Sequence, residues 1–357
     1  MWWAALGVAM LVVGAGCDDG ADGSQGGSTD GSASVATGPI SPSFVDMLRL
    51  VPDTPANRAI LLDYVSFDRA RGGEPAATAA DDLQLLASNT AQHVQMPSIG
   101  RGLEDPEFAA AAGFDTRQVA AALGQYAFDG FVVLAGSMDP ATVSAAVQAS
   151  QTSEAGAPTV TVDGTYTIVA VGEEGSGSLR EMSVLRPSGE GLRWAIGNGA
   201  LIAGVTDAQV RESRRSADSG TSLAYAVDYA AVATALDAAG AVNASILDEY
   251  PQQQEASGEA ADEAWEVLGI GESFAGETST VTLVFRYADA GTAADQMAAF
   301  PAHLDDVSAV RGSPWSEAFT LEDIHADGLT VIATLHSTAP GGVRTALMQR
   351  DNLFTFG

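Results

Sequence analysis

The chain has 357 residues, 46% of them hydrophobic and 17% charged, which is enough for one large or two ordinary domains. Acidic residues outnumber basic ones by 46 to 16, and every basic residue is Arg. Chemistry that requires Lys, such as a Walker A loop or a pyridoxal Schiff base, is therefore excluded. The single Cys excludes an internal disulfide and a multi-cysteine metal site, and the formal charge of −30 disfavours nucleic acid as a partner.

An uncharged, mostly apolar run from Trp2 to Val13 opens the chain, followed by three small residues and then Cys17. As a helix this run rises about 18 Å, too short for a bilayer core of about 30 Å, so residues 1–16 are predicted to be a signal peptide. The lone Cys after small residues resembles the bacterial lipobox, although Gly14 stands where Leu is usual. The resemblance implies that Cys17 is lipidated and anchors the protein to a membrane of the cell envelope, on its periplasmic or extracellular face. An ordinary secretory signal followed by a free Cys is the alternative.

Residues 18–38 contain six Gly, four Ser and four Asp, and almost none of them can be buried. Together with Cys17 they are predicted to form a disordered tether, residues 17–38, with a root-mean-square length of about 25 Å. The four Asp residues lack the alternate spacing and the closing Glu of an EF-hand calcium loop.

Three dipeptides flanked by β-rich runs predict hairpins in the globular part: Asp163-Gly164, Asn198-Gly199 and Asp327-Gly328. Asn-Gly and Asp-Gly tolerate the positive φ angles of a type I′ turn, so this turn type is expected at each. Ala-rich amphipathic runs predict the helices, several with Asp or Thr at the expected start. These runs are 78–88, 107–112, 116–124, 140–150, 206–215, 222–238, 259–268, 291–300 and 341–349.

The predicted elements repeat along the chain. ANRAILLDY (56–64) resembles AVNASILDEY (241–250), and the segment 131–147 resembles 281–297. The Asp163-Gly164 hairpin then corresponds to the one at Asp327-Gly328, and the Asn198-Gly199 hairpin is an additional element of the first half. We therefore expect an α+β fold of two duplicated halves, 39–239 and 240–357, each a mostly antiparallel sheet with hairpins, covered by helices on one face.

Three segments carry a family resemblance: VPDTPANRAILLDYVSFDRAR (51–71), AAGFDTRQVAAAL (111–123) and FDGFVVLAGSMDPATVSAAV (128–147). Their order, followed by the hairpin pairs, is similar to that of uncharacterised bacterial envelope proteins and lipoproteins with repeated α/β units. The resemblance covers residues 48–240. It implies no assigned chemistry and no functional residues.

The four His residues do not form an expected metal site. In a two-residue hairpin at Asp327-Gly328, His325 would face Thr330, and His336 would lie about 20 Å away along the strand. We expect His325 on the surface beside Asp323. For His93 and His303 we expect no Asp, Glu or His partner at helical ligand spacing.

The segment Gly271-Glu272-Ser273-Phe274-Ala275 is the nearest match to a nucleophile elbow, which needs a strand before its Ser and a helix after it. Here a helical run (DEAWEVLG) is predicted before Ser273 and a strand (TSTVTLVF) after it, so the order is reversed. The segments Gly197-x-Gly199 and Gly175-x-Gly177 are interpreted as turns rather than dinucleotide loops.

Adjacent acids recur along the chain and are interpreted as solvated surface, because neighbours in sequence diverge on a helix or a strand. They are Asp81-Asp82, Glu104-Asp105, Glu173-Glu174, Asp305-Asp306 and Glu322-Asp323. The cluster Arg211, Arg214 and Arg215 is expected at the end of a helix, where cations offset the helix dipole; an acidic partner bound there is the alternative.

These observations favour a lipid-anchored envelope protein with a non-enzymatic binding or scaffolding role, its ligand a protein or a small molecule. We expect no catalytic residue, cofactor or metal. The alternative is an envelope hydrolase with a scattered carboxylate and His site. A deep pocket with converging titratable residues would favour the enzyme, and a shallow apolar patch between the halves would favour binding.

Overall fold

A computed structural model of the chain describes residues 40–72, 77–82, 107–125, 131–150, 156–174, 183–186, 189, 191–248, 265–275, 278–338, 340–349 and 351–354. The predicted signal peptide and the predicted tether, which includes Cys17, lie outside these ranges. His93 also lies outside them. Within them, no helix is long and apolar enough to cross a membrane.

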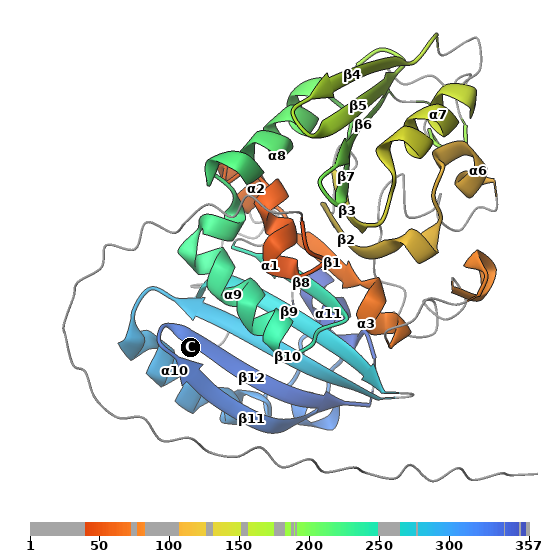
Figure 1. The fold of residues 1–357 in the computed structure, drawn as a ribbon. Helices are drawn as coiled ribbons and strands as arrows, with labels where there is room; N and C mark the ends of the chain where they lie inside the picture. Colours follow the sequence, from red (N-terminus) through yellow and green to blue (C-terminus); the bar gives the residue numbers. More distant parts are fainter. Residues whose placement is uncertain are drawn as a thin grey trace, which may run out of the picture. The chain divides into compact units, whose positions relative to one another are not determined.

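The described strands form a single sheet of twelve strands in the order β11-β12-β10-β9-β8-β1-β2-β3-β7-β6-β5-β4, and every neighbouring pair is antiparallel (Figure 1). The strands of the first half are β1 (Leu62–Ser66), β2 (Val119–Gln125), β3 (Val132–Gly136), β4 (Thr159–Asp163), β5 (Tyr166–Val171), β6 (Leu192–Gly197) and β7 (Ala200–Gly204). Those of the second half are β8 (Asn243–Leu247), β9 (Trp265–Ala275), β10 (Thr278–Tyr287), β11 (Phe319–Asp327) and β12 (Thr330–Ser337). The antiparallel α+β prediction is confirmed, but the two expected sheets are one.

Helices cover both faces of this sheet, so the expectation of cover on one face is wrong. One face packs against α1 (Phe44–Met47), η1 (Leu48–Leu50), α8 (Asp207–Ser219), η4 (Leu223–Tyr225) and α9 (Val227–Ala238). The opposite face packs against α3 (Phe67–Arg71), α6 (Phe108–Ala112) and α7 (Pro140–Ser150) in the first half, and against α10 (Ala290–His303), η6 (Trp315–Glu317), α11 (Gly342–Met348) and η7 (Asn352–Phe354) in the second. The short helices α2 (Pro55–Arg58) and η2 (Thr116–Gln118) are further elements of the described residues.

The central strands explain why two helical layers are needed. Strands β1 and β6 are buried at every position, so neither strand has a solvent-exposed face. A strand that is apolar on both sides must be covered on both sides. One core therefore runs along the α9 face from β5 to β10, while the opposite face carries two separate cores.

All three predicted hairpins are present, but only one has the expected turn. Asn198 and Gly199 form the loop between β6 and β7, and both have positive φ, at 52° and 77°, as a type I′ turn requires. In the other two hairpins Asp163 pairs with Tyr166 and Asp327 with Thr330, so each Asp belongs to its strand. The loops there begin at Gly164 and Gly328, which alone have positive φ, the pattern of a type II′ turn.

Two predicted helices are strands. Residues 116–124 contain only the 3₁₀ turn η2, after which the Ala-rich run continues as β2. Of the run 259–268, the described part begins at Trp265 and belongs to β9. Strands β2 and β9 are both interior strands of the sheet, where burial and cross-strand pairing outweigh the helix preference of Ala, Leu and Glu.

Glycines let α9 pack closely on the middle of the sheet. A Cβ added to Gly269 would lie 2.3 Å from Val232 Cγ1, and one added to Gly271 would lie 2.9 Å from Leu236 Cδ2. Both Val232 and Leu236 are fully buried on α9. The glycine that resembled the start of a nucleophile elbow is therefore a packing residue.

The order of the strands corrects one expected equivalence between the halves. Strand β12 lies directly beside β10, whereas β5 is separated from β3 by β6 and β7. The hairpin beside the third strand of the first half is thus β6–β7, so the turns at Asp163-Gly164 and Asp327-Gly328 are not equivalent. The expected boundary, 239–240, lies in the connection between α9 and β8, and the sheet is continuous across it.

Candidate functional site

A group of buried polar side chains lies at the middle of the sheet, where the two cores of one face meet. Val65 on β1 belongs to the core of the first half, and Leu247 on β8 to that of the second. Alternation along the strands places four polar residues on this same face between the two cores. We call this group the central polar cluster: Asp63, Asn243, Ser245 and Glu272, together with Arg344 of α11.

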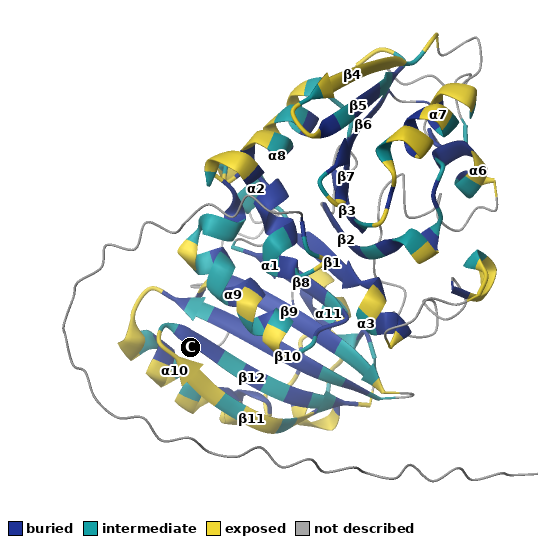
Figure 2. Ribbon diagram, viewed as in Figure 1, coloured by how far each residue is buried: buried dark blue, intermediate teal, exposed yellow. Residues whose placement is uncertain are grey.

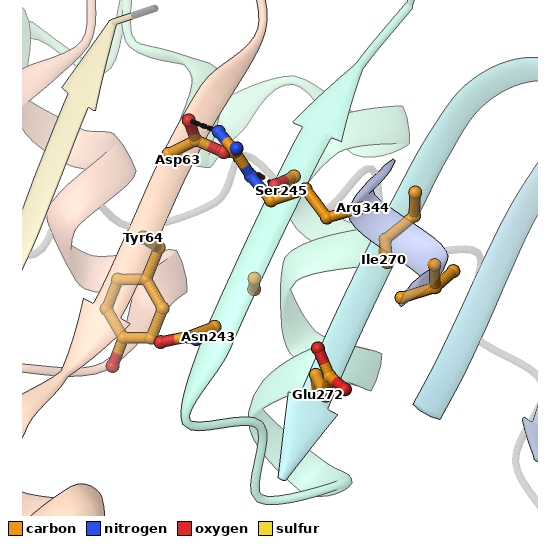
Figure 3. Close-up of a pocket in the computed structure, with 9 residues that line it drawn as sticks. Asp63, Tyr64, Asn243, Ser245, Ile270, Glu272 and Arg344 are labelled. Atoms are coloured by element: carbon orange, nitrogen blue, oxygen red, sulfur yellow. Dashed lines mark hydrogen bonds and ion pairs between the residues drawn. The ribbon is translucent and has the colours of Figure 1, made fainter. Parts of the chain in front are cut away.

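Asp63 is held from two directions. It is 6% exposed, and Ser245, its direct cross-strand partner on β8, donates a hydrogen bond of 2.6 Å from Oγ to Asp63 Oδ1. Arg344 Nη2 reaches across from α11 to donate to Asp63 Oδ2 (Figure 3). Burial raises the pKa of Asp63, and Arg344 and Ser245 oppose this rise. The pair ties the helix near the end of the chain to the first strand.

Glu272 on β9 is buried without a cation. Its Oε1 accepts hydrogen bonds from Ser279 Oγ at 2.6 Å and from the backbone N–H of Gly341 at 2.8 Å. No Arg or His of the described residues forms a salt bridge with it. Burial raises the pKa of Glu272, and the two hydrogen bonds counter this rise in part. The carboxyl therefore holds its proton to a higher pH than an exposed Glu.

Asn243 lies between the two acids, opposite Val65 on β1 and Glu272 on β9. Its side-chain nitrogen and oxygen are buried and form no hydrogen bond with the described residues. The cavity beside it, lined by the members of the central polar cluster, has a volume of about 20 Å³. That is room for about one water molecule and not for a substrate.

A larger cleft lies elsewhere, with a volume of about 410 Å³ between α2 and the start of α8. Phe131 forms part of its wall, and Glu212 is the one carboxylate among the described residues that line it. Thr54, Thr206 and Ser213 also line the cleft with hydroxyl groups, but its described lining residues include no His and no second acid. A single carboxylate of this kind does not assemble a catalytic group. The larger cleft thus lacks a group of converging titratable residues, and the cavity that has such residues is too small for a substrate.

The described His residues lie outside this cluster. The expectation that His303 has no carboxylate at ligand spacing is wrong, because Asp306 lies three residues after it. His303 ends α10, where Nδ1 lies 2.8 Å from Asp306 Oδ2 and Nε2 lies 2.8 Å from the carbonyl oxygen of Asn352. His325 is exposed with Nδ1 2.8 Å from Asp323 Oδ2, which confirms the predicted surface position beside a carboxylate. It faces Ile332 rather than Thr330, because Asp327 belongs to the strand, and half-buried His336 faces Thr320.

Ser273 lies inside β9, and its hydroxyl donates to the carbonyl oxygen of Gly240 at 3.3 Å. The expected helix before it is a strand, so the elbow geometry is absent for a different reason from the one predicted. In the described part of the chain, no group of three His, Cys, Asp or Glu is placed to hold a metal.

Not every acid pair is solvated surface. Asp82 is fully buried and accepts two hydrogen bonds from Arg71, at 2.8 and 2.9 Å. Arg71 also donates to the carbonyl oxygens of Thr116 and Val119, so the buried charges are paired and satisfied. Glu174 accepts from the backbone N–H of Asp207. Residues 104–105 lie outside the described ranges.

The Arg cluster also has a different role from the expected one, because α8 continues to Ser219. Arg211 Nη1 lies 3.1 Å from Asp163 Oδ2, and Arg214 Nη2 lies 3.3 Å from Asp163 Oδ1. These contacts tie the turn between β4 and β5 to the middle of the helix.

Sequence reasoning missed the central polar cluster, although one signal was available. Of the two segments recognised as similar, 56–64 includes the start of β1 and 241–250 contains β8, and these strands pair with each other at the centre of the sheet. A polar residue between apolar residues in both segments marks the place where the cluster lies.

No protein-family model matches the sequence, and no curated protein matches it. Solved structures with some likeness include three crystal forms of a protein named TP0453. Forms I, III and IV are 10%, 10% and 11% identical, with TM-scores of 0.37, 0.38 and 0.40. The matches cover 84–88% of this chain and 96–98% of TP0453. TM-scores this low do not establish a shared fold, and we infer nothing about this chain from them.

Proposed function

We propose that this chain is a lipid-anchored protein of the cell envelope with a non-enzymatic binding or scaffolding role. One observation carries the proposal: the titratable side chains that converge at the centre of the sheet enclose only about 20 Å³. Asp63 and Glu272 there already accept hydrogen bonds from other strands and from the segment around α11. The cluster thus connects the two halves through buried hydrogen bonds and does not serve as a site for a substrate.

The anchor rests on Cys17 and the segment that follows it. A lipidated Cys17 would hold the folded part at the membrane surface on the tether 17–38, as the lipobox resemblance implies. To test it, cells that express the wild type and Cys17→Ser are fractionated with a phase-separating detergent. We expect the wild type in the detergent phase and the variant in the aqueous phase. Equal partition of both would contradict the anchor.

The alternative, an envelope hydrolase, is favoured by one feature: two buried acids with raised pKa values, Asp63 and Glu272, lie in the same cluster. The purified protein is assayed on generic ester, phosphate, glycoside and peptide substrates, and we expect no turnover. Turnover abolished by Glu272→Gln, in a variant that is still fully folded, would replace the proposal by the enzyme. His303→Ala and Ser273→Ala are tested in the same assay.

We also propose that the halves 39–239 and 240–357 arose by duplication. In its favour, the meanders β1-β2-β3 and β8-β9-β10 both start at the centre, and in each half a helix follows the third strand. A returning hairpin, β6–β7 or β11–β12, then lies beside that strand. An alignment of homologues should relate 243–287 to 62–136 at matching buried positions. Similarity no greater than that of shuffled sequences would contradict a common origin.

A further inference from the structure

In the part of the chain that the structure describes, one end of the sheet is open and carries exposed apolar side chains. Strand β4 is the terminal strand and, among the described residues, pairs with β5 alone. Val160 is 40% and Val162 76% exposed, the latter more than any other large apolar side chain of the described chain. Figure 2 shows β4 as an exposed ribbon beside buried β5 and β6. A β-rich strand with unpaired backbone groups is a template for another strand.

The hairpin geometry determines which backbone groups face outward. Asp163 and Tyr166 flank the two-residue loop, so they form a hydrogen-bonded pair. Because such pairs alternate with non-bonded ones, Thr161 and Thr159 also direct their N–H and C=O groups toward β5. The backbone groups of Val160 and Val162 therefore point away from the sheet.

The other end of the sheet is built differently. Strand β11 carries exposed acids at Glu322, Asp323 and Asp327, and its register with β12 shifts between Leu321 and Asp323. Charged side chains and bulges are the usual protection of an edge against pairing. Two copies of β11 brought together would place like charges side by side, whereas residues 159–162 of β4 carry no charge.

We propose that β4 is a self-association edge, where a second copy of this chain adds its own β4 in antiparallel orientation. A two-fold axis beside Thr161 places Val160 of each copy opposite Val162 of the other. These are the residues whose backbone groups face outward, so each such pair exchanges two hydrogen bonds. The four Val side chains then gather on one face of a continuous sheet.

Charge explains why a second copy suits this edge despite the net charge of −30. The nearest acid, Asp163, is already paired with Arg211 and Arg214 on α8. In the proposed register it lies opposite Thr159 of the other copy, so no charge faces a like charge. The proposal names a partner for the binding role above, yet it rests on the edge alone and holds whether or not Cys17 is lipidated.

The association is expected to be weak in solution. A five-residue strand buries far less than the roughly 1,200–2,000 Å² of a stable interface. Confinement of both copies to one membrane would raise their effective concentration. The test must therefore capture a transient pair.

The experiment uses the full chain with Cys17→Ser, so that an introduced Cys is the only thiol. In the proposed register the two Thr161 residues form a non-bonded pair with Cα atoms about 4.5 Å apart, within the range of a disulfide. Thr161→Cys should form a covalent dimer under mild oxidation at micromolar concentration. Thr320→Cys, an exposed Thr on the β11 edge, is the matched control and should cross-link at least tenfold more slowly.

A second substitution tests the valine contact. Val162→Asp, added to Thr161→Cys, should slow cross-linking at least tenfold, while Val227→Asp, at a site of similar exposure on α9, should leave it unchanged. Neither site is buried, so both variants should keep the unfolding free energy of the parent. Equal cross-linking at Thr161 and Thr320, or no effect of Val162→Asp, would overturn the proposal and leave the edge to a partner other than this chain.

Discussion

Glu272 shows how one buried carboxyl links folding to pH. An acid whose pKa is raised in the folded state binds its proton more tightly there than in the unfolded chain. Its contribution to stability is therefore fully present below the ordinary pKa of Glu and is lost as pH rises through the folded-state pKa. Between the two pKa values folding takes up a proton from solution, and above the folded-state pKa it must bury the charge.

Glu272→Gln tests this linkage because Gln cannot ionise and its Oε1 can still accept from Ser279 and Gly341. The unfolding free energy of the variant relative to wild type should rise between pH 4 and pH 7. The gain should be about 1.4 kcal/mol for each pH unit over which the folded wild type retains the proton. Urea unfolding across this range measures it, with Glu322→Gln on the exposed edge as the control for loss of one negative charge. A difference independent of pH would contradict the raised pKa.

Arg344 and Asp63 provide a second test, of coupling between residues 281 positions apart. Arg344→Met should lower the unfolding free energy by about 3–5 kcal/mol, because it leaves the carboxylate of Asp63 buried without its cation. Asp63→Asn in the same chain removes that charge, so the double variant should be more stable than the sum of the single effects implies. Denaturant unfolding of the four proteins completes the cycle. Strict additivity would show that the two groups do not interact.

Single residues were predictable from the sequence where the cause is local. The surface position of His325 beside Asp323 follows from alternation along one strand and is confirmed. Burial of Asp82 was not predictable, because its partner Arg71 reaches it only after α3 packs near η2. The same holds for Asp63, whose neighbours Ser245 and Arg344 come from distant segments.

At the scale of elements, the approach of α9 to the sheet depends on glycines in β9. Gly271→Ala should cost about 1–3 kcal/mol of unfolding free energy, because the new methyl group meets Leu236 and Ala241 at 2.9 Å. Gly124→Ala in β2 is the matched control. Its Cβ would have nothing nearer than Val132 Cγ2 at 3.7 Å, so we expect no loss of stability. Equal effects of the two substitutions in urea unfolding would contradict the packing argument.

Elements were predictable where a local signal agrees with the tertiary pairing. The three hairpins follow from turn chemistry and helices α7, α8, α9, α10 and α11 from Ala-rich amphipathic runs, and all are present. The segment 116–124, in spite of its Asp115-Thr116 start signal, and the described part of 259–268 were wrong as helices, because Ala, Leu and Glu favour a helix unless tertiary pairing decides otherwise. The type II′ turns were missed because the loop begins one residue later than Asp-Gly suggests.

At the scale of the whole molecule, one sheet and one shared core join both halves. The core on the α9 face includes Ile168 of β5 and Val284 of β10, one from each half. We therefore expect the halves to unfold together. Hydrogen exchange should give the slowest amides of β3 and β10 the same opening free energy and the same dependence on urea. Two values with different urea dependence would show that the halves open independently.

The class of fold followed from the sequence, but its assembly did not. Antiparallel pairing was predictable from hairpins, which are local. The union of two sheets into one depends on the β1–β8 pairing, whose strands are separated by about half the chain, and no local signal reports it. The candidate site lies at this junction, so it was missed for the same reason.

The long separation across that junction has a consequence for how the protein is made. A chain that leaves a ribosome or a translocation channel from its N-terminus presents β1 long before β8, and Asp63 long before Arg344. The middle of the sheet therefore stays open, with apolar strands uncovered, until almost the entire polypeptide has emerged. Such a chain passes easily through a channel while it is unfinished, because it has not yet folded. A prematurely terminated copy that lacks α11 would keep Asp63 at its centre without Arg344, and proteases would cleave it readily.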